Sequence, residues 1–406
     1  MSNPDYDVIV IGAGIAGSAL LRSLAGSGLR LALVEAAPLA ADSPNTSAAQ
    51  SVADFDARVS AITPASQTFL TDIGAWDLLG QQRLGPYSHM QVWDAEGTGS
   101  IDFHAGELDA PVLGHIVENR QLTAALLSGL DACTDLQVFS PARLQALDLS
   151  AADRVQLELE DGRQLTGNLL VAADGALSRV RDLARFQTRE WDYGQYALVT
   201  TVETSSQHQA TAWQRFLSTG PLAFLPLPSY GERHFCSIVW SAEPALAQAL
   251  KEMPEAEFQQ ALEEAIEGRL GTVLASSART VFPLRQRHAV DYIKPRIALV
   301  GDAAHTIHPL AGQGINLGIQ DVAALSLELR QAVRRGIDAG DSAVLRRYQR
   351  QRKGENLVMM AAMDGFKRLF GQQQLPLRWL RNSGMNLVAR SGPLKHQLMR
   401  HAMGVR

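Results

Sequence analysis

The amino end of the chain shows two short apolar runs, separated by a glycine-rich turn and a helical pattern. Residues 7–11 are β-branched apart from the first, which is typical of a strand buried on both faces. The helical pattern continues to about Ala25, and the second apolar run, residues 29–34, ends at Glu35. The order predicts a strand, turn, helix and strand unit of about 30 residues. The three glycines of the turn are Gly12, Gly14 and Gly17.

Alternating apolar and polar positions dominate the middle of the chain. Residues 155–159 alternate before an Asp-Gly pair, which predicts a hairpin. Longer alternating segments lie between residues 182 and 285, and they indicate a mostly antiparallel sheet. The buried-strand pattern returns at residues 296–300, and the pattern after Gly314 is helical.

Together these patterns predict an α/β protein. A Rossmann-like nucleotide-binding domain is interrupted by a mostly antiparallel β-sheet domain and followed by a helical C-terminal region. We place the nucleotide-binding domain in residues 1–181 and 286–333, with part of the substrate region inserted at about residues 75–115. The β-rich substrate domain is expected in residues 182–285, and the helical region in residues 334–406.

Composition and length exclude several classes of protein. The chain has 406 residues, enough for two or three domains, and 46% of them are hydrophobic. Its longest apolar runs are far shorter than the roughly 18–20 residues that a membrane span requires. The polar, acidic amino end lacks the basic residues of a signal peptide. The two cysteines, Cys133 and Cys236, lie too far apart for a dithiol motif or a zinc ribbon, so we expect a cytoplasmic globular protein.

Charge is distributed unevenly along the chain. The formal net charge is −5, yet residues 334–406 hold 15 Lys and Arg against 4 Asp and Glu. Such a basic region can bind an anionic membrane surface or an acidic partner. It can also be a set of packed helices with basic outer faces, which we favour because such faces are common. Nucleic-acid binding is not expected, and homo-oligomerisation stays open.

The glycine motif suits the chemistry of a dinucleotide site. Gly12 permits the tight turn, Gly14 lets the backbone approach a pyrophosphate, and Gly17 allows the helix to pack closely on the strand. The pyrophosphate would lie at the helix N-terminus, where free N–H groups favour anions. Glu35 is placed to accept hydrogen bonds from a ribose, which favours FAD or NAD over a nucleotide with a phosphorylated ribose.

Two further predicted strands end next to a carboxylate. The strand at residues 170–173 leads into Asp174, and the strand at residues 296–300 leads into Gly301 and Asp302. Ligands of nucleotide-binding sheets bind at this carboxyl edge. A glycine-rich turn then feeds a helix, and it offers N–H groups and a positive helix end to an anion or a polarised carbonyl. The candidate residues of this turn are Pro309, Gly314 and Asn316.

This set of motifs resembles the FAD-dependent aromatic hydroxylases, the class A flavoprotein monooxygenases that share the p-hydroxybenzoate hydroxylase fold. The resemblance implies FAD as the bound cofactor and NAD(P)H as a transient co-substrate. In that family the Gly-Asp carboxylate binds a ribityl hydroxyl, which implies this role for Asp302 after Gly301. It also implies that Asp174 contributes to FAD and NAD(P)H binding. The residues implied to lie against the flavin ring are Pro309, Gly314 and Asn316.

Longer stretches resemble the ubiquinone-biosynthesis hydroxylases within that family. They are residues 56–62, 114–120, 191–193 and 301–309. The similarity is greatest to the subfamily that hydroxylates C5 of 2-polyprenylphenols, and it extends from Asp7 to nearly the end of the chain. It implies a polyprenylphenol and O₂ as substrates, and contact with a ubiquinone-biosynthesis complex or the periphery of the inner membrane through the basic region. It also implies that Arg58 and Arg120 contact FAD through charge-assisted hydrogen bonds.

The reaction implied by the resemblance is aromatic monooxygenation. NAD(P)H reduces FAD, the reduced flavin and O₂ form a C4a-hydroperoxide, and the distal oxygen is transferred to the phenol ring. The phenol needs a base or a hydrogen-bond acceptor for activation, and the sequence does not identify that group. The prenyl tail needs an apolar channel, which we expect over one face of the β-rich domain. The candidate lining residues are Phe216, Leu222, Phe224 and Leu227, although we favour the interpretation that they form the core of that domain.

Two other functions stay open from the sequence. A flavin-dependent dehydrogenase or isoprenoid reductase would bind FAD on the same fold without inserting oxygen. A flavin-binding scaffold could organise other enzymes through its basic tail, although the full set of flavin motifs argues against a purely structural role. His305 and His308 have a spacing seen among metal ligands. No Glu or Cys cluster accompanies them, so we favour a structural role and expect no metal.

Overall fold

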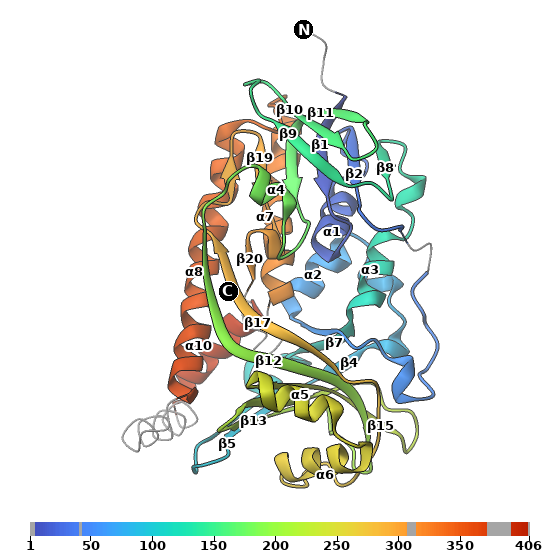
Figure 1. Ribbon diagram of the computed structural model, residues 1–406, viewed down its shortest axis with the longest axis vertical. Helices are drawn as coiled ribbons and strands as arrows, with labels where there is room; N and C mark the ends of the chain where they lie inside the picture. Colours follow the sequence, from blue (N-terminus) through green and yellow to red (C-terminus); the bar gives the residue numbers. More distant parts are fainter. Residues whose placement is uncertain (1–4, 40–42, 307–313, 372–390, 405–406) are drawn as a thin grey trace.

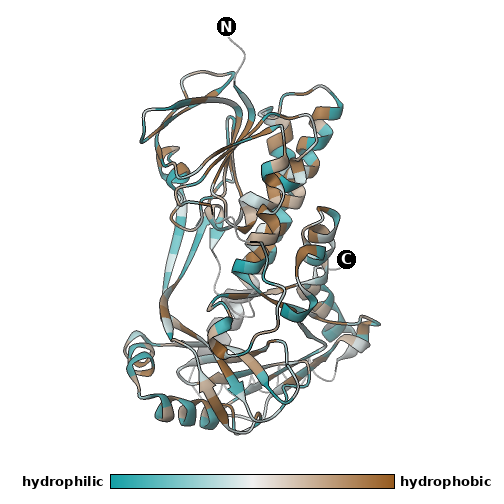
Figure 2. Cartoon of the chain, turned by 90° about the vertical axis from the view of Figure 1, so that its right-hand side faces the viewer, coloured by the Kyte–Doolittle hydropathy of each residue, from teal (hydrophilic) through white to brown (hydrophobic). Residues whose placement is uncertain are grey.

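A mixed sheet with a parallel centre lies in the upper half of the molecule and a mostly antiparallel sheet in the lower half (Figure 1). The computed structural model describes residues 5–39, 43–306, 314–371 and 391–404. Two long strands, β12 (Thr188–Thr204) and β17 (Thr280–Ala289), pair along the side of the molecule and reach from one half to the other. The middle of this ribbon is hydrophilic (Figure 2).

The upper sheet has the Rossmann-like arrangement that the sequence predicts. Its strand order is β18-β19-β11-β1-β2-β8, and β9 and β10 extend it by antiparallel pairing. Strand β1 pairs in parallel with both neighbours, so Ile11 lies beside Ala172 and Val34. The strands are β1 (Tyr6–Ile11), β2 (Leu31–Val34), β8 (Leu136–Phe139), β9 (Leu144–Asp148), β10 (Val155–Leu159), β11 (Gln164–Ala172), β18 (Ile293–Lys294) and β19 (Ile297–Leu299).

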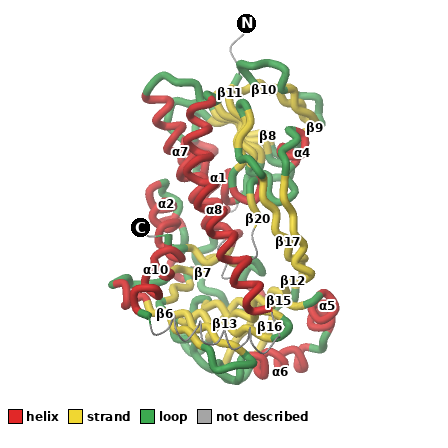
Figure 3. Tube along the Cα trace, turned by 90° about the vertical axis from the view of Figure 1, so that its left-hand side faces the viewer, coloured by secondary structure: helices red, strands yellow, loops and turns green. Residues whose placement is uncertain are grey.

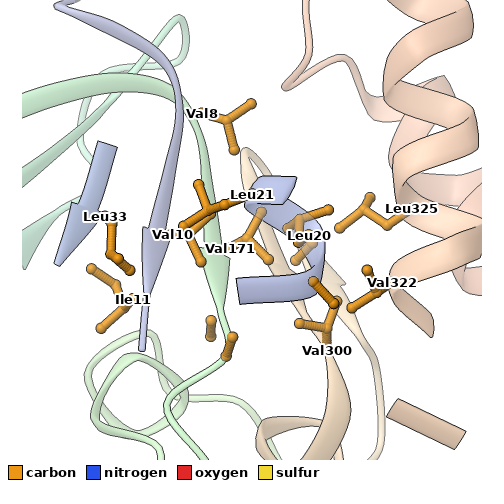
Figure 4. Packing of buried hydrophobic residues seen from close by; sticks show 14 of the residues in the cluster. Val8, Val10, Ile11, Leu20, Leu21, Leu33, Val171, Val300, Val322 and Leu325 are labelled. Carbon is orange, nitrogen blue, oxygen red and sulfur yellow. The ribbon is translucent and has the colours of Figure 1, made fainter. Parts of the chain in front are cut away.

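Helices pack on this sheet to form the largest apolar cluster. Val8 and Val10 of β1 lie near Leu20 and Leu21 of α1, and Val322 of α7 completes the contact (Figure 4). All five side chains are fully buried, so the β-branched run of β1 and the apolar face of α1 stabilise each other. The helices of this half are α1 (Ile15–Leu24), α2 (Pro64–Asp72), α3 (Asn119–Leu127), α4 (Arg179–Leu183) and α7 (Gly314–Arg334).

The lower sheet has the order β20-β17-β12-β15-β14-β13-β5-β6, and β16 pairs with β12. Its pairs are antiparallel except for β13 and β5. A three-stranded sheet, β3-β7-β4, lies between the two halves (Figure 1). The remaining strands are β3 (Val59–Ile62), β4 (Gly85–Tyr87), β5 (His89–Asp94), β6 (Ser100–His104), β7 (Gly114–Glu118), β13 (Thr211–Leu217), β14 (Gly220–Pro226), β15 (His234–Ala242), β16 (Val273–Ser276) and β20 (His305–Thr306).

Two helices that the alternating pattern did not predict cover one face of the lower sheet. They are α5 (Pro244–Glu252) and α6 (Glu255–Ala265). Leu222 and Phe224 of β14 are fully buried against this layer, in one cluster with Phe258 of α6. The opposite face of strands β12 to β15 is turned toward the upper half of the molecule.

The C-terminal region contains α8 (Ser342–Gly371), which runs beside α7 (Figure 3), and α10 (Gly392–Met403). Several of its basic side chains bind carboxylates of the same chain, at N–O distances of 2.5–3.0 Å. These pairs are Arg347–Glu328, Lys353–Asp291 and Lys395–Glu107. This supports the interpretation of packed helices with basic faces. No helix within the described ranges has the length and apolar character needed to cross a membrane.

Candidate functional site

A cavity of about 500 Å³ lies where the carboxyl edge of the upper sheet faces the lower sheet. We call it the chamber. Its upper wall contains the glycine turn after β1, the turn after β19 and the first residues of α7. Its floor is formed by side chains from β12 to β15, and β17 contributes one side. The carboxyl ends of parallel strands are where α/β sheets bind ligands.

The glycine turn after β1 is shaped by close backbone contacts. Gly12 has a φ of +102°, and a Cβ there would lie 2.5 Å from the carbonyl oxygen of Ala173. A Cβ at Gly17 would lie 1.9 Å from the carbonyl oxygen of Gly12. A Cβ at Gly14 would meet no atom within 4 Å, and this residue lines the chamber. The turn therefore leaves open space in front of the N-terminus of α1, where an anion would be stabilised.

Glu35 is tied to the same turn. Its Oε2 accepts a hydrogen bond from the Ala13 N–H at 2.7 Å, and its Oε1 accepts one from the Ala37 N–H at 2.8 Å. The residue follows the last residue of β2 and is half-buried. The carboxylate thus lies beside the glycine turn, as its position in the sequence predicts.

The turn after β19 places a carboxylate in the chamber. Gly301 has a φ of +59°, and a Cβ at Gly318 would lie only 3.1 Å from its Cα, so this turn and α7 are in close contact. The Asp302 side chain is exposed to the chamber. Protein surrounds it on its other sides and raises the pKa of its carboxyl, while His305 and Arg58 act in the opposite direction. Asp302 can therefore present its carboxyl group to a ligand hydroxyl in the chamber.

Behind that turn lies a buried ionic network that the sequence analysis did not predict. Asp321 of α7 is fully buried, and its Oδ2 lies 3.2 Å from the Gly301 N–H and 2.5 Å from His305 Nε2. Its Oδ1 accepts hydrogen bonds from Arg352 Nε at 2.9 Å and Asn356 Nδ2 at 3.1 Å. Burial alone would raise the pKa of Asp321, but the attraction of His305 and Arg352 lowers it. The network joins the turn after β19 to α7 and α8.

Of the two predicted arginines, Arg58 lines the chamber and Arg120 lies outside its lining. Asp56 accepts hydrogen bonds from the backbone N–H groups of both, at 3.2 and 3.0 Å. Beneath them, Arg83 and Glu118 form a buried ion pair with contacts of 2.7 and 2.9 Å. Glu118 also accepts a hydrogen bond from the Asp56 N–H at 2.7 Å, and burial raises the pKa of its carboxyl. This pair, which the sequence analysis missed, supports the loop that carries Arg58.

Asp174 binds a helix of its own domain. Its Oδ2 accepts a hydrogen bond from the Val180 N–H at 3.1 Å, in the first turn of α4, and burial raises the pKa of the carboxyl. Its neighbour Gly175 lines the chamber. The Asp-Gly pair therefore divides its contacts between the helix and the cavity.

The start of α7 combines a chamber residue with an anchor. Gly314 lines the chamber. Asn316 is buried, accepts a hydrogen bond from the Thr63 N–H at 3.0 Å and donates one to the Ala61 carbonyl at 2.7 Å. It therefore ties α7 to strand β3 and the residue that follows it. Pro309 falls outside the described residues, so its predicted contact stays a prediction.

The floor of the chamber differs from the predicted channel. Phe216, Leu222, Phe224 and Leu227 are buried and are absent from the lining. Successive side chains of a strand point to opposite faces, and Leu222 and Phe224 face the layer of α5 and α6 instead. The interpretation of these four residues as core is therefore confirmed, and the alternative that they line the channel is wrong. The floor residues are Ala197, Val199, Gln214, Pro221, Ala223, Leu225, Ser237, Val239 and Ser241.

Of the two histidines at residues 305 and 308, the structure describes His305, which has a structural role. His305 is buried and pairs with Asp321. His308 falls outside the described residues. In the ranges that the structure describes, no group of three or more His, Cys, Asp or Glu side chains could hold a metal ion.

Comparison with known proteins identifies the family. A family model described as an FAD binding domain matches residues 5–362. The chain belongs to the FAD-dependent monooxygenase family. The monooxygenase is 38% identical over 408 residues to 3-demethoxyubiquinol 3-hydroxylase of Escherichia coli, with 100% of both chains covered. It is 36% identical over 441 residues to ubiquinone biosynthesis monooxygenase COQ6 of Xenopus tropicalis, with 98% of this chain and 93% of the relative covered.

The fold is also similar to solved structures. PqsL of Pseudomonas aeruginosa, solved in complex with 2-aminobenzoylacetate, superimposes with a TM-score of 0.76 and 22% identity, covering 94% of this chain and 99% of that chain. This similarity confirms the α/β monooxygenase fold that the sequence predicts. The cofactor of the family is FAD, and NAD(P)H is the co-substrate typical of it.

The residues of the chamber fit FAD. Gly14 leaves the space that a pyrophosphate would fill at the start of α1, and Asp302 presents a carboxylate to hydroxyl groups. Arg58 supplies a positive charge on the same cavity. Such a combination is suited to a ligand that carries both phosphate and polyhydroxyl groups.

Substitution of Asp302 should weaken FAD binding without unfolding the protein. Loss of a hydrogen bond to a charged group costs about 1.5–3 kcal/mol, so we expect Asp302→Ala to lower FAD affinity by roughly 10- to 100-fold. The measurement is a titration of apoprotein with FAD, followed by quenching of flavin fluorescence. Asp161→Asn, in the half-exposed hairpin turn before β11, is the control and should leave the affinity unchanged. Equal affinities for Asp302→Ala and the unaltered protein would contradict the assignment.

Proposed function

We propose that this monooxygenase hydroxylates the aromatic ring of a polyprenylated phenol in ubiquinone biosynthesis, at C5 of 2-polyprenylphenol. The similarity to ubiquinone-biosynthesis hydroxylases over the whole chain carries the proposal. The chamber supports it, because the nucleotide-binding wall faces an uncharged floor of mostly small or apolar side chains, which suits a neutral aromatic ring.

The predicted residues are assigned to different parts of the cofactor. Bound FAD would supply electron transfer from NAD(P)H and the activation of O₂. We assign the pyrophosphate to the glycine turn and the N-terminus of α1, and the ribose to Glu35. Asp302 binds the ribityl chain. The other residues assigned to FAD are Arg58, Arg120, Asp174, Pro309, Gly314 and Asn316.

A second candidate reaction is hydroxylation of 3-demethoxyubiquinol. It is favoured by one observation, the 38% identity to the Escherichia coli enzyme of that name. Contact of residues 334–406 with the inner membrane or with other enzymes of the pathway belongs to the same proposal. The intramolecular ion pairs of Arg347, Lys353 and Lys395 leave fewer cations for such a contact than the sequence count indicates.

Labelling with ¹⁸O₂ tests the proposed reaction. The purified protein is incubated with FAD, NAD(P)H and either 2-prenylphenol or a short-chain 3-demethoxyubiquinol, and the products are analysed by mass spectrometry and NMR. We expect one labelled oxygen at C5 of the phenol. Labelling of the demethoxyubiquinol alone would select the second candidate. Oxidation of NAD(P)H without label in either ring would instead indicate a dehydrogenase or reductase.

A further inference from the structure

One long polar side chain, Gln214, rises from the floor of the chamber. It lies on β13, lines the cavity and is only 8% exposed. The residues beside it in the same row of the sheet are Ala223 on β14, Val239 on β15 and Val199 on β12. All three are shorter and apolar, so the carboxamide of Gln214 projects above its row into the chamber.

The carboxamide of Gln214 has no partner in the described part of the chain. Among the residues that the structure describes, none forms a hydrogen bond with its side chain or with those of the floor serines, Ser237 and Ser241. The carboxamide lines the open cavity, so a ligand there can hydrogen-bond it without displacing an intramolecular partner. Gln91 on the adjacent strand β5 differs, because its Oε1 accepts a hydrogen bond from Arg269 at 3.0 Å.

The floor around Gln214 is uncharged. None of the described floor residues on β12 to β15 is Asp, Glu, Lys, Arg or His. An anionic substituent on the ring would lose its hydration there without gaining a counter-ion. A neutral phenol replaces the hydrogen bonds that it gives up to water, because its hydroxyl can donate to the Oε1 of the carboxamide and accept from its Nε2. The floor therefore favours a ring with a neutral oxygen substituent near β13.

We propose that Gln214 is the specificity residue that holds the ring oxygen of the substrate. Its Oε1 accepts a hydrogen bond from the phenol O–H, which increases the electron density of the ring and fixes the ring orientation on the floor. The carboxamide takes up no proton, so this contact orients and polarises the phenol and a separate group must remove the proton. The identity of the phenol rests on the proposed function, whereas the contact itself is tested by binding.

Binding of a phenol and its methyl ether isolates the contact. The FAD-loaded enzyme, without NAD(P)H, is titrated with 2-prenylphenol and with 2-prenylanisole, and the change in flavin absorbance gives each Kd. The ether lacks the proton that Gln214 accepts, so we expect the unaltered enzyme to bind the phenol roughly tenfold more tightly. Gln214→Leu should lose this preference, with the Kd of the ether changed by less than about twofold.

Gln91→Leu is the matched control, because it removes the same side chain from the neighbouring strand and should keep the preference. If Gln214→Leu does not retain FAD, Gln214→Met provides the same comparison with an unbranched side chain. A preference that persists in the Gln214 variant, that is absent from the unaltered enzyme, or that disappears in Gln91→Leu would overturn the assignment. Failure of ¹⁸O insertion in an enzyme that still prefers the phenol would contradict the proposed function and leave the Gln214 contact standing.

Discussion

Replacement of Gly17 by alanine is expected to destabilise the nucleotide-binding half of the protein by about 3 kcal/mol or more. The added Cβ would lie 1.9 Å from the Gly12 carbonyl oxygen and 3.2 Å from the Cβ of Ala173. The first of these atoms belongs to the backbone, so relief requires that α1 move away from β1. That movement would open the contact between Leu20, Leu21 and the apolar residues of β1, which are fully buried.

Gly14→Ala separates this steric effect from cofactor binding. A Cβ at Gly14 meets no atom within 4 Å, so the apoprotein should unfold at an unchanged temperature. The methyl group would occupy the space left for a pyrophosphate, and we expect FAD affinity to fall at least tenfold, the equivalent of about 1.4 kcal/mol.

Thermal unfolding of the apoproteins by circular dichroism and fluorescence titration with FAD measure the two effects. Gly354→Ala, on α8 with open space around it, is the control, because alanine is favoured there by roughly 0.5–1 kcal/mol. Equal unfolding temperatures for Gly17→Ala and the control would show that the close approach of α1 and β1 is not required.

The turn glycines and the first strands are predictable because their signals are local. Gly12 precedes a helix, follows a buried strand and has the positive φ that its motif requires. Glu35 follows β2 directly, and the residue after a strand in such a unit lies at the ligand-binding edge whatever the rest of the chain does. These features depend on about 30 consecutive residues, and the structure contains them as predicted.

The floor of the chamber could not be predicted in the same way. Leu222 and Ala223 are adjacent on one strand and face opposite sides of the sheet. Which side is covered by helices depends on α5 and α6, which come later in the chain and pack on the more strongly apolar face. The large side chains therefore fill the core beneath the sheet, and smaller ones remain for the chamber. Gln214 lies on the face with the smaller side chains, where the sequence pattern gives no strong signal.

One local feature of the sequence points to the ionic network around Asp321, namely a carboxylate within an apolar helical pattern. Leu317 and Leu325 lie four residues before and after it, so Asp321 falls on the apolar face of α7. A carboxylate in that position must find partners or disrupt the packing. Its partners His305 and Arg352 lie in distant segments, and only the three-dimensional fold brings them together.

Asp321→Asn is expected to destabilise the protein by about 3–5 kcal/mol at neutral pH. The substitution preserves the shape of the side chain but leaves Arg352, which is 3% exposed, without its buried counter-ion. Chemical unfolding of the FAD-free protein measures the loss. Asp291→Asn is the control. Asp291 pairs with Lys353, which lies on α8 next to Arg352, and this pair is largely open to solvent, so it should contribute less than about 1 kcal/mol.

The pH dependence of this difference distinguishes charge from packing. The pKa of Asp321 is lower in the folded protein than in an unfolded chain, where it is about 4, so ionised Asp321 stabilises the fold above that pH. The contribution decreases as the pH falls below about 4 toward the folded value, and the gap in unfolding free energy between the unaltered protein and Asp321→Asn should narrow there. A gap that stays constant into acid would mean that the asparagine disturbs packing alone. Asp321 also accepts a hydrogen bond from the Gly301 N–H, in the turn that presents Asp302. If the FAD affinity of the unaltered protein falls over the same pH range in which the gap narrows, the charge of Asp321 supports the geometry of that turn.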